Sequence, residues 1–387
     1  MPLSLASTKH IAELTVLRAA LLTRRVMTSA LTSSSSLSKP DATPVTMADF
    51  GAQALLMASL RSFFPHDGYV GEEDAEALRS NPQLANAVHA LVAEASADFS
   101  RHHEESVNED EELSLPGPKS LDEMLELLDL AGRGQPGPRG RFWIMDPVDG
   151  TAAFLKGQQY AVSLALVEDG REVLGVLCYP NLSLDEGVVS ETSVDVHGCG
   201  VMLSAVRGEG VDYRKLSTEY RLGPPRKLDR LPSPAKLSDL RFVDCLASKS
   251  SRLDIAEGLA TQMGALPFPG VDLWSSHVRY AALMLGDDNN ASDGGRQRVM
   301  IRVPVGVRGL PSRACVWDHA GSQLLYAEMG GKVTDLEGRE MDFGRGRTLA
   351  GNWGLVAAPE GVHGEVLRLV REWVERDPVI QGGAAAA

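Results

Sequence analysis

The sequence predicts a mixed α/β protein, and three features of the chain support this fold class. The chain has 387 residues, of which 43% are hydrophobic, so it can bury a large core divided over two domains. Residues 161–167 and 172–179 are apolar runs joined by Glu168-Asp169-Gly170, which is typical of a β-hairpin. Between residues 240 and 303, strand-like runs alternate with helical patterns, as they do in α/β layers.

Residues 1–39 are basic, and two interpretations fit their composition. Five basic side chains stand against the single acid Glu13, as in a mitochondrial transit peptide. Apolar residues also recur at helical spacing, which a first helix packed on the core would show. These apolar residues are Ile11, Leu14, Leu17, Leu21 and Leu22. We favour the structural helix and a cytoplasmic location, with mitochondrial import of residues 1–39 as the alternative.

Residues 1–207 are predicted to form an N-terminal α+β domain that carries the metal-binding motifs. Helices are expected at residues 49–64, ended by Pro65, and at residues 84–98 and 120–131. An acidic stretch at residues 104–112 is interpreted as a solvated loop.

Residues 208–238 contain four prolines and little periodicity, which indicates a connection between domains. Residues 239–387 would then form a C-terminal α/β domain. Its expected strands are residues 240–246, 298–303, 332–335 and 354–358. Its expected helices are residues 252–264, 274–285, 317–329 and 360–376. Residues 286–296 form a polar loop that could be an insertion.

Charge and composition exclude several classes of function. A formal net charge of −14 argues against a general nucleic-acid surface, although metals and a few basic side chains can still hold a small phosphorylated ligand. The chain has no run of about 18 apolar residues, so no membrane span is expected. The four cysteines are far apart and lack C-x-x-C spacing, which fits a reducing compartment.

The segment from Arg141 to Thr151 is the most informative in the chain. Its first five residues predict a strand. Pro147 has no backbone N–H to donate to a neighbouring strand, so the chain is expected to leave the sheet at Asp146. Asp146 and Asp149 would then lie on a turn before a short helix that Thr151 begins. Mg²⁺ prefers such carboxylate ligands and shares its shell with substrate phosphate. A turn with solvated acids explains the pair equally well.

Two further acids favour the metal site over the solvated turn. Glu72 follows Gly71 at the end of a strand-like step, and Asp318 lies in the first turn of the helix expected at residues 317–329. There Asp318 could cap the helix or bind a cation. Each feature alone is weak, but a two-metal site requires several acids on rigid elements, and here they occur together.

These motifs resemble those of the inositol monophosphatase superfamily of Mg²⁺-dependent phosphatases. The matching segments are D-P-V-D-G-T at residues 146–151 and W-D-H-A-G at residues 317–321. Residues 39–49 and 341–350 are also similar to two stretches of the lithium-sensitive 3′(2′),5′-bisphosphate nucleotidase subgroup. The resemblance extends from about residue 39 to residue 376. It implies the layered α-β-α-β-α sandwich of the inositol monophosphatase and fructose-1,6-bisphosphatase type.

The resemblance also implies the metal ligands. One Mg²⁺ would be held by Glu72, Asp146 and the Val148 carbonyl, and a second by Asp146, Asp149 and Asp318, with Glu72 able to face a third. Asp146 would bridge the first two ions.

The catalytic roles implied by the family fall on Asp49 and Thr151, which would orient and deprotonate the attacking water. The backbone N–H groups of Gly150 and Thr151 would cradle the phosphate. One cation would lower the pKa of the water, and the other would neutralise charge on the phosphate and the leaving oxygen. No covalent phospho-enzyme is required.

The nucleotide end of the site departs from the subgroup pattern. Ser276 and Arg279 stand where the subgroup has Ser and Lys, and Lys249 replaces a His that lies against adenine. Arg302 matches the Arg of the subgroup's R-L-P motif. Ala152-Ala153 replaces Lys-Gly after the D-G-T turn. For Lys249 and Arg279, solvent-exposed surface charge is an equally good interpretation.

Three functions remain open from sequence. The favoured one is hydrolysis of the 3′-phosphate of 3′-phosphoadenosine 5′-phosphate and its sulfated form. The expected partner is this small phosphorylated nucleotide substrate, with no nucleic acid and no membrane, and the expected role is in sulfur assimilation. The alternatives are an inositol phosphate phosphatase and a catalytically silent nucleotide-binding paralogue. Retention of every metal acid, of Asp49 and of Thr151 argues against the silent paralogue. His277 and His319 are expected to be structural, and the oligomeric state, with a monomer as one option, is left open.

Overall fold

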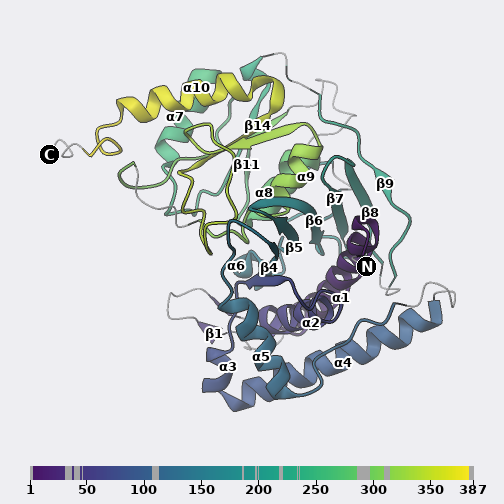
Figure 1. Ribbon diagram of the computed structural model, residues 1–387. Helices are drawn as coiled ribbons and strands as arrows, with labels where there is room; N and C mark the ends of the chain where they lie inside the picture. The colour runs from purple at the N-terminus through teal and green to yellow at the C-terminus, as the bar shows by residue number, and fades with distance from the viewer. Residues whose placement is uncertain are drawn as a thin grey trace.

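The computed structural model describes most of the chain as alternating layers of helix and sheet (Figure 1). The described residues are 3–30, 37–38, 44–45, 47–106, 113–184, 187–196, 198, 200–217, 221–232, 234, 236–285, 297–308 and 314–382. The subgroup-like stretch at residues 39–49 lies largely outside this part, as does the loop expected at residues 286–296. Residues 107–112 of the expected acidic loop also lie outside it, and helix α4 extends to Ser106.

The larger sheet of the described part has seven strands in the order β3-β4-β5-β6-β7-β8-β9. They span Gly68–Gly71, Arg141–Asp149, Ala161–Glu168, Arg171–Tyr179, Val201–Val206, Val211–Lys215 and Arg226–Lys227. β3 is parallel to β4, and the remaining neighbours are antiparallel. β8 and β9 lie within the connection expected at residues 208–238 and extend this sheet, while the division into two domains stays a prediction.

The second sheet has five strands in the order β11-β10-β12-β14-β13. They span Val271–Asp272, Arg241–Asp244, Arg298–Arg302, Leu355–Pro359 and Gly331–Thr334. β10 is parallel to both of its neighbours, and the other pairings are antiparallel. The short strands β1 (Leu37–Ser38) and β2 (Pro44–Val45) pair separately.

Helices cover both sheets and fill the space between them (Figure 1). α1 (Leu5–Ala30) and α2 (Met47–Phe63) pack on one face of the larger sheet, with α3 (Glu76–Ser80), α4 (Pro82–Ser106) and α5 (Leu121–Gly132) outside them. α8 (Ser276–Leu285) and α9 (Ser322–Glu328) lie between the sheets. α7 (Leu253–Met263) and α10 (Glu360–Arg376) cover the outer face of the second sheet. This is the expected α-β-α-β-α sandwich.

The first helix is part of the core. Ile11, Leu14, Leu17 and Leu22 are buried in α1. Arg18 is buried as well, and its guanidinium donates to the carbonyl oxygens of residues 55, 115 and 116. Arg18, one of the basic residues that resembled a transit peptide, is therefore buried and hydrogen-bonded inside the fold. Among the described residues, no helix has the length and apolar character that a membrane crossing requires.

The predicted hairpin is confirmed with a turn of two residues, Asp169 and Gly170. Both have positive φ, 50° and 80°, as a tight turn between right-twisted strands requires. Glu168 belongs to β5 and pairs with Arg171.

The prediction that the chain leaves the sheet at Asp146 is wrong. β4 continues to Asp149, which pairs with Ala161 of β5 after a shift in register that begins at Asp146. Pro147 does interrupt the ladder because it lacks an N–H, but an irregularity absorbs the interruption and pairing resumes. Asp146 and Asp149 therefore lie on the distorted end of a paired strand, not on a turn outside the sheet.

The helix expected at residues 317–329 begins later, at Ser322. Gly321 precedes it with φ +83°, which a continuous α-helix cannot contain. A Cβ on Gly175 of β6 would lie 2.8 Å from the Cα of Gly321, so this backbone packs directly against the sheet. Asp318 consequently lies in a turn fixed by the sheet, and the prediction that it occupies the first turn of a helix is wrong.

Candidate metal centre

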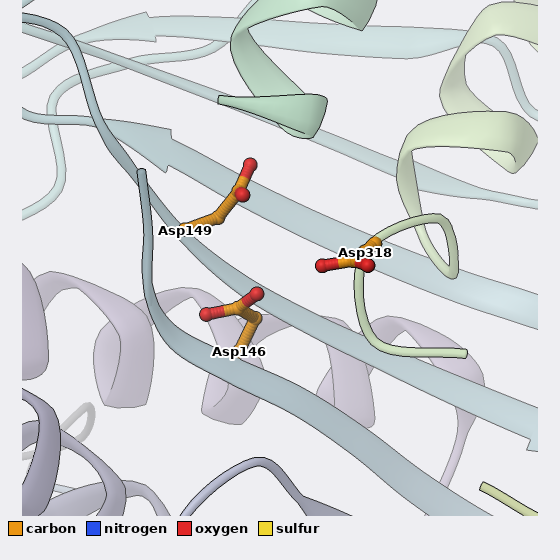
Figure 2. A group of neighbouring side chains, drawn as sticks. All are labelled: Asp146, Asp149 and Asp318. Carbon is orange, nitrogen blue, oxygen red and sulfur yellow. The ribbon is translucent and has the colours of Figure 1, made fainter. Parts of the chain in front are cut away.

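Three carboxylates converge at the distorted end of β4 (Figure 2). Asp146 and Asp149 come from β4, and Asp318 comes from the turn before α9. One oxygen from each lies within 4.8 Å of the others. Asp146 and Asp149 are buried, with 1% and 8% exposure, and Asp318 is half-buried. These three acids, here called the acidic triad, form a compact set of oxygen ligands.

The acidic triad is electrostatically unfavourable without a counter-charge. Burial raises the pKa of Asp146 well above its ordinary value, and repulsion from Glu72, Asp149, Asp318 and Asp49 adds to the effect. Burial, with repulsion from Asp149 and Glu72, raises the pKa of Asp318 to about 7. Crowded carboxylates resist full ionisation unless a cation neutralises them. A buried set of hard oxygen donors fits a divalent metal such as Mg²⁺.

Glu72 and Asp49 lie close to the acidic triad but outside it. Glu72 is half-buried and directly follows the last residue of β3. Its charge raises the pKa of both Asp146 and Asp318. Asp49, in α2, has 1% exposure and contributes to the raised pKa of Asp146. The structure thus brings together acids from four separate segments.

Hydrogen bonds fix the backbone between Asp146 and Thr151. The N–H of Val148 donates to Asp146 Oδ1 at 3.2 Å, and Thr151 Oγ1 donates to the Val148 carbonyl at 3.2 Å. Gly150 has φ +98°, and a Cβ there would lie 2.9 Å from the Cβ of Ser275. Both positive φ and close approach therefore require glycine at position 150.

Asp149 is held by the start of α8. Its Oδ2 accepts hydrogen bonds from Ser275 Oγ at 2.5 Å and from the N–H of His277 at 2.6 Å. Ser275 Oγ also accepts from the N–H of Val278 at 3.0 Å, as an N-cap does. Ser275 was not predicted as a site residue. The helix was predicted to begin at residue 274, so Ser275 was placed inside it, whereas α8 begins at Ser276. The sequence did not indicate the contact with Asp149.

Arg279 is buried, which contradicts its interpretation as surface charge. It has 3% exposure and donates to the carbonyls of Leu273 and Trp274 at 3.1 Å and to Ser276 Oγ at 2.9 Å. Its guanidinium therefore also holds the turn that leads into α8.

A cavity of about 500 Å³ is lined by one residue of the acidic triad and by two of the four predicted nucleotide side chains, whereas Ser276 and Arg279 do not line it. Asp318, Lys249 and Arg302 contribute to its polar lining. Arg302, at the end of β12, donates to Ser250 Oγ at 3.1 Å, and Lys249 is exposed at the rim. The apolar lining includes Met341, Leu349, Trp353 and Leu355.

His277 and His319 are buried and hydrogen-bonded within the protein. The ring nitrogens of His277 lie 2.5 Å from Ser322 Oγ and 2.8 Å from the Trp317 carbonyl. His319 Nδ1 lies 3.3 Å from the Tyr280 hydroxyl. Burial lowers the pKa of both imidazoles, so both are neutral near pH 7. Their contacts favour a structural role.

Comparison with known families agrees with this site. The model of the inositol monophosphatase family matches residues 5–375. The chain belongs to the inositol monophosphatase family. This membership confirms the resemblance seen in the motifs, and the family is one that implies dependence on a divalent metal.

Curated relatives confirm the predicted subgroup. The chain is 35% identical to the 3′(2′),5′-bisphosphate nucleotidase of Emericella nidulans, over 94% of this chain and 97% of the relative. It is 34% identical to the enzyme of that name from Schizosaccharomyces pombe, over 98% and 99%. A 3′,5′-bisphosphate nucleotidase 2 from Arabidopsis thaliana is 30% identical, over 88% and 89%.

Solved structures support the fold. The extragenic suppressor protein suhB from Bartonella henselae superposes with a TM-score of 0.55 at 16% identity, over 95% of this chain and 99% of that one. An IMPase from Thermotoga maritima gives a TM-score of 0.52 at 19% identity, over 93% and 95%. At these identities the likeness concerns the fold alone.

Proposed function

We propose that the protein is a Mg²⁺-dependent 3′(2′),5′-bisphosphate nucleotidase. Its substrate would be 3′-phosphoadenosine 5′-phosphate, converted to AMP and phosphate, together with the sulfated form, converted to adenylyl sulfate. The observation that carries this proposal is the acidic triad, whose Asp318 lines a cavity together with Arg302 and Lys249. The names of the curated relatives add the nucleotide class.

The metal ligands are assigned within this proposal. Glu72, Asp146 and the Val148 carbonyl would hold one cation, and Asp146, Asp149 and Asp318 would hold the second, with Glu72 also able to face a third. Bound cations supply charge neutralisation at the phosphate and lower the pKa of a coordinated water. The convergence of the triad and the closeness of Glu72 support this assignment.

The protein groups around the attacking water are Thr151 and Asp49. Thr151 Oγ1 donates its proton to the Val148 carbonyl, which leaves its lone pairs able to accept a hydrogen bond from water and so to orient it. Asp49 lies in the same buried acidic environment and is assigned as the general base that takes the proton of this water. The backbone N–H groups of Gly150 and Thr151 are assigned to the phosphate.

The lining of the cavity favours a nucleotide over an inositol phosphate. A nucleotide combines anionic groups with a flat apolar base, and the lining combines Arg302 and Lys249 with apolar side chains that include Trp353. Stacking and burial of the base against such a surface are favourable. An inositol ring carries hydroxyl groups around its edge and would make few apolar contacts with these side chains. Ser276 and Arg279 complete the assigned substrate contacts from the start of α8.

A phosphate-release panel tests the proposal. At fixed Mg²⁺, the purified protein is given 3′-phosphoadenosine 5′-phosphate, its sulfated form and inositol phosphates, with Asp146→Asn as the inactive control. We expect the two nucleotides to be cleaved fastest and Li⁺ to inhibit, because a small cation can occupy one metal position. Preference for an inositol phosphate would overturn the nucleotide assignment, and release from none of them would favour a nucleotide sensor.

A cytoplasmic location is also proposed for the protein. Its support is the burial of α1: cleavage of residues 1–39 as a transit peptide would remove a helix that packs on α2 and on the larger sheet.

A further inference from the structure

We propose that Arg347 is a positioning residue that sets the distance between the Glu72 and Asp318 sides of the metal centre. This inference rests on the proposed function, because it concerns the same metal ligands. Arg347 belongs to the stretch at residues 341–350, whose sequence resembles the nucleotidase subgroup and which the assigned chemistry leaves without a role.

The backbone around Arg347 holds the segment that leads to Asp318. Its carbonyl accepts from the N–H of Val316 at 3.0 Å, and the N–H of Leu349 donates to the Ala314 carbonyl at 2.9 Å. Thr348 and Cys315 form the antiparallel bridge between these bonds. Residues 347–349 therefore support residues 314–316, and Asp318 follows only two residues later.

The side chain of Arg347 reaches the opposite side of the centre. Nη2 donates to the Gly71 carbonyl at 2.6 Å, and Gly71 is the last residue of β3, directly before Glu72. Nη1 donates to the carbonyls of Ala131 and Gly134, both at 3.2 Å, at the end of α5. The guanidinium carbon also lies 4.5 Å from the centroid of the Trp317 ring, next to Asp318. One side chain thus links both ligand-bearing segments.

Only arginine offers this combination of contacts. Its planar guanidinium can donate in several fixed directions and stack on an aromatic ring at the same time, whereas a lysine ammonium is a compact point charge. The far side of Glu72 is fixed independently, because Gln53 donates from Nε2 to the Glu73 carbonyl at 2.6 Å and accepts from the N–H of Glu73 at 2.9 Å. Removal of the Arg347 side chain should therefore make the distance between Glu72 and Asp318 more variable, while β3 stays packed against α2.

Direct binding of Mn²⁺, followed by electron paramagnetic resonance, tests the inference. The variants are Arg347→Gln and Arg347→Lys, with Arg345→Gln as the matched control. Arg345 lies on the same segment, but its side chain is 65% exposed and forms an ion pair with Asp342. Near-UV circular dichroism reports folding, and nucleotide KM is measured at saturating Mg²⁺.

We expect Arg347→Gln to weaken Mn²⁺ binding by about 10- to 100-fold, the usual effect of losing an outer-shell partner of metal ligands. Arg345→Gln should bind as the wild type does, and the nucleotide KM of Arg347→Gln at saturating metal should stay close to that of the wild type. If Arg347→Gln does not fold, Arg347→Lys decides, because it keeps the cation beside Trp317 but loses the guanidinium fork. Unchanged Mn²⁺ affinity in a folded Arg347 variant would overturn the inference.

Failure of the proposed function is distinguishable in the same experiment. If the wild-type protein binds Mn²⁺ no better than Asp146→Asn does, the assignment of these acids as a metal centre is wrong. A second outcome is that the wild type binds Mn²⁺, the Arg347 variants bind it weakly, and no phosphorylated substrate is cleaved. In that case the proposed function is wrong, but the positioning role of Arg347 is supported.

Discussion

Replacement of Ser275 by alanine should disturb the metal centre through Asp149. Ser275 Oγ donates to the Asp149 carboxylate at 2.5 Å and accepts from the N–H of Val278 at 3.0 Å, so Ser275→Ala removes a charged hydrogen bond and a helix cap together. A cap contributes about 1 kcal/mol and a hydrogen bond to a charged group about 1.5–3 kcal/mol. Ser275→Ala should therefore lower the free energy of unfolding by about 2.5–4 kcal/mol.

Ser120 provides the matched control for this prediction. It caps α5 by accepting from the N–H of Glu123 at 3.2 Å, in an exposed position away from the acidic triad. Ser120→Ala should cost about 1 kcal/mol, the value of the cap alone. Urea unfolding in EDTA measures both variants without bound metal.

The same two variants separate stability from metal binding. Because Asp149 loses one of the two donors that orient it, Ser275→Ala should also weaken Mn²⁺ binding by about tenfold. Ser120→Ala should leave it unchanged. The reasoning is refuted if Ser275→Ala is no more destabilising than Ser120→Ala and binds Mn²⁺ as the wild type does.

Three further predictions concern Asp146, Arg279 and Glu172. Asp146→Asn should reduce phosphate release by at least about 100-fold, since one side chain is assigned to both cations; near-normal turnover would remove it from the metal centre. Arg279→Ala should raise the KM for 3′-phosphoadenosine 5′-phosphate by about tenfold with a smaller change in kcat, whereas an unchanged KM with lowered stability would confine Arg279 to holding the turn before α8. Burial, opposed in part by Arg207, raises the pKa of Glu172 to about 7 from its ordinary 4.5. Ionisation of Glu172 therefore lowers the free energy of unfolding as the pH rises from 4.5 to about 7. Above pH 7 the loss amounts to about 3 kcal/mol. Glu172→Gln should accordingly be more stable than the wild type at pH 8 but not at pH 4.5, and equal offsets in urea unfolding at the two pH values would contradict this.

Local sequence patterns were sufficient for most elements of the fold. The hairpin around Asp169-Gly170 was predicted because its strands and turn are adjacent in the chain, and the final helix agrees with its predicted residues, 360–376. The exceptions occur where distant packing overrides a local signal. β4 passes through Pro147 because β5 resumes pairing beyond it, and the turn at Asp318 is set by the contact between Gly321 and Gly175.

The sequence by itself determined which acids are available for the metal centre. Asp146 and Asp149 stand in one short motif, and residue type and spacing were enough to select them, together with Glu72 and Asp318, as candidate ligands. Nothing local indicates their depth of burial, which decides how strongly the acids repel one another and favour a cation.

Only the tertiary structure decided how these acids are held and what lies beside them. Ser275 contacts Asp149 across 126 residues of sequence, and Arg347 contacts Gly71 across 276. Arg279 was an equally plausible surface charge until its burial was visible. Such contacts depend on how separate elements pack, because a hydrogen bond requires two groups to meet within about 3 Å in a defined direction, and one-dimensional spacing does not specify that meeting.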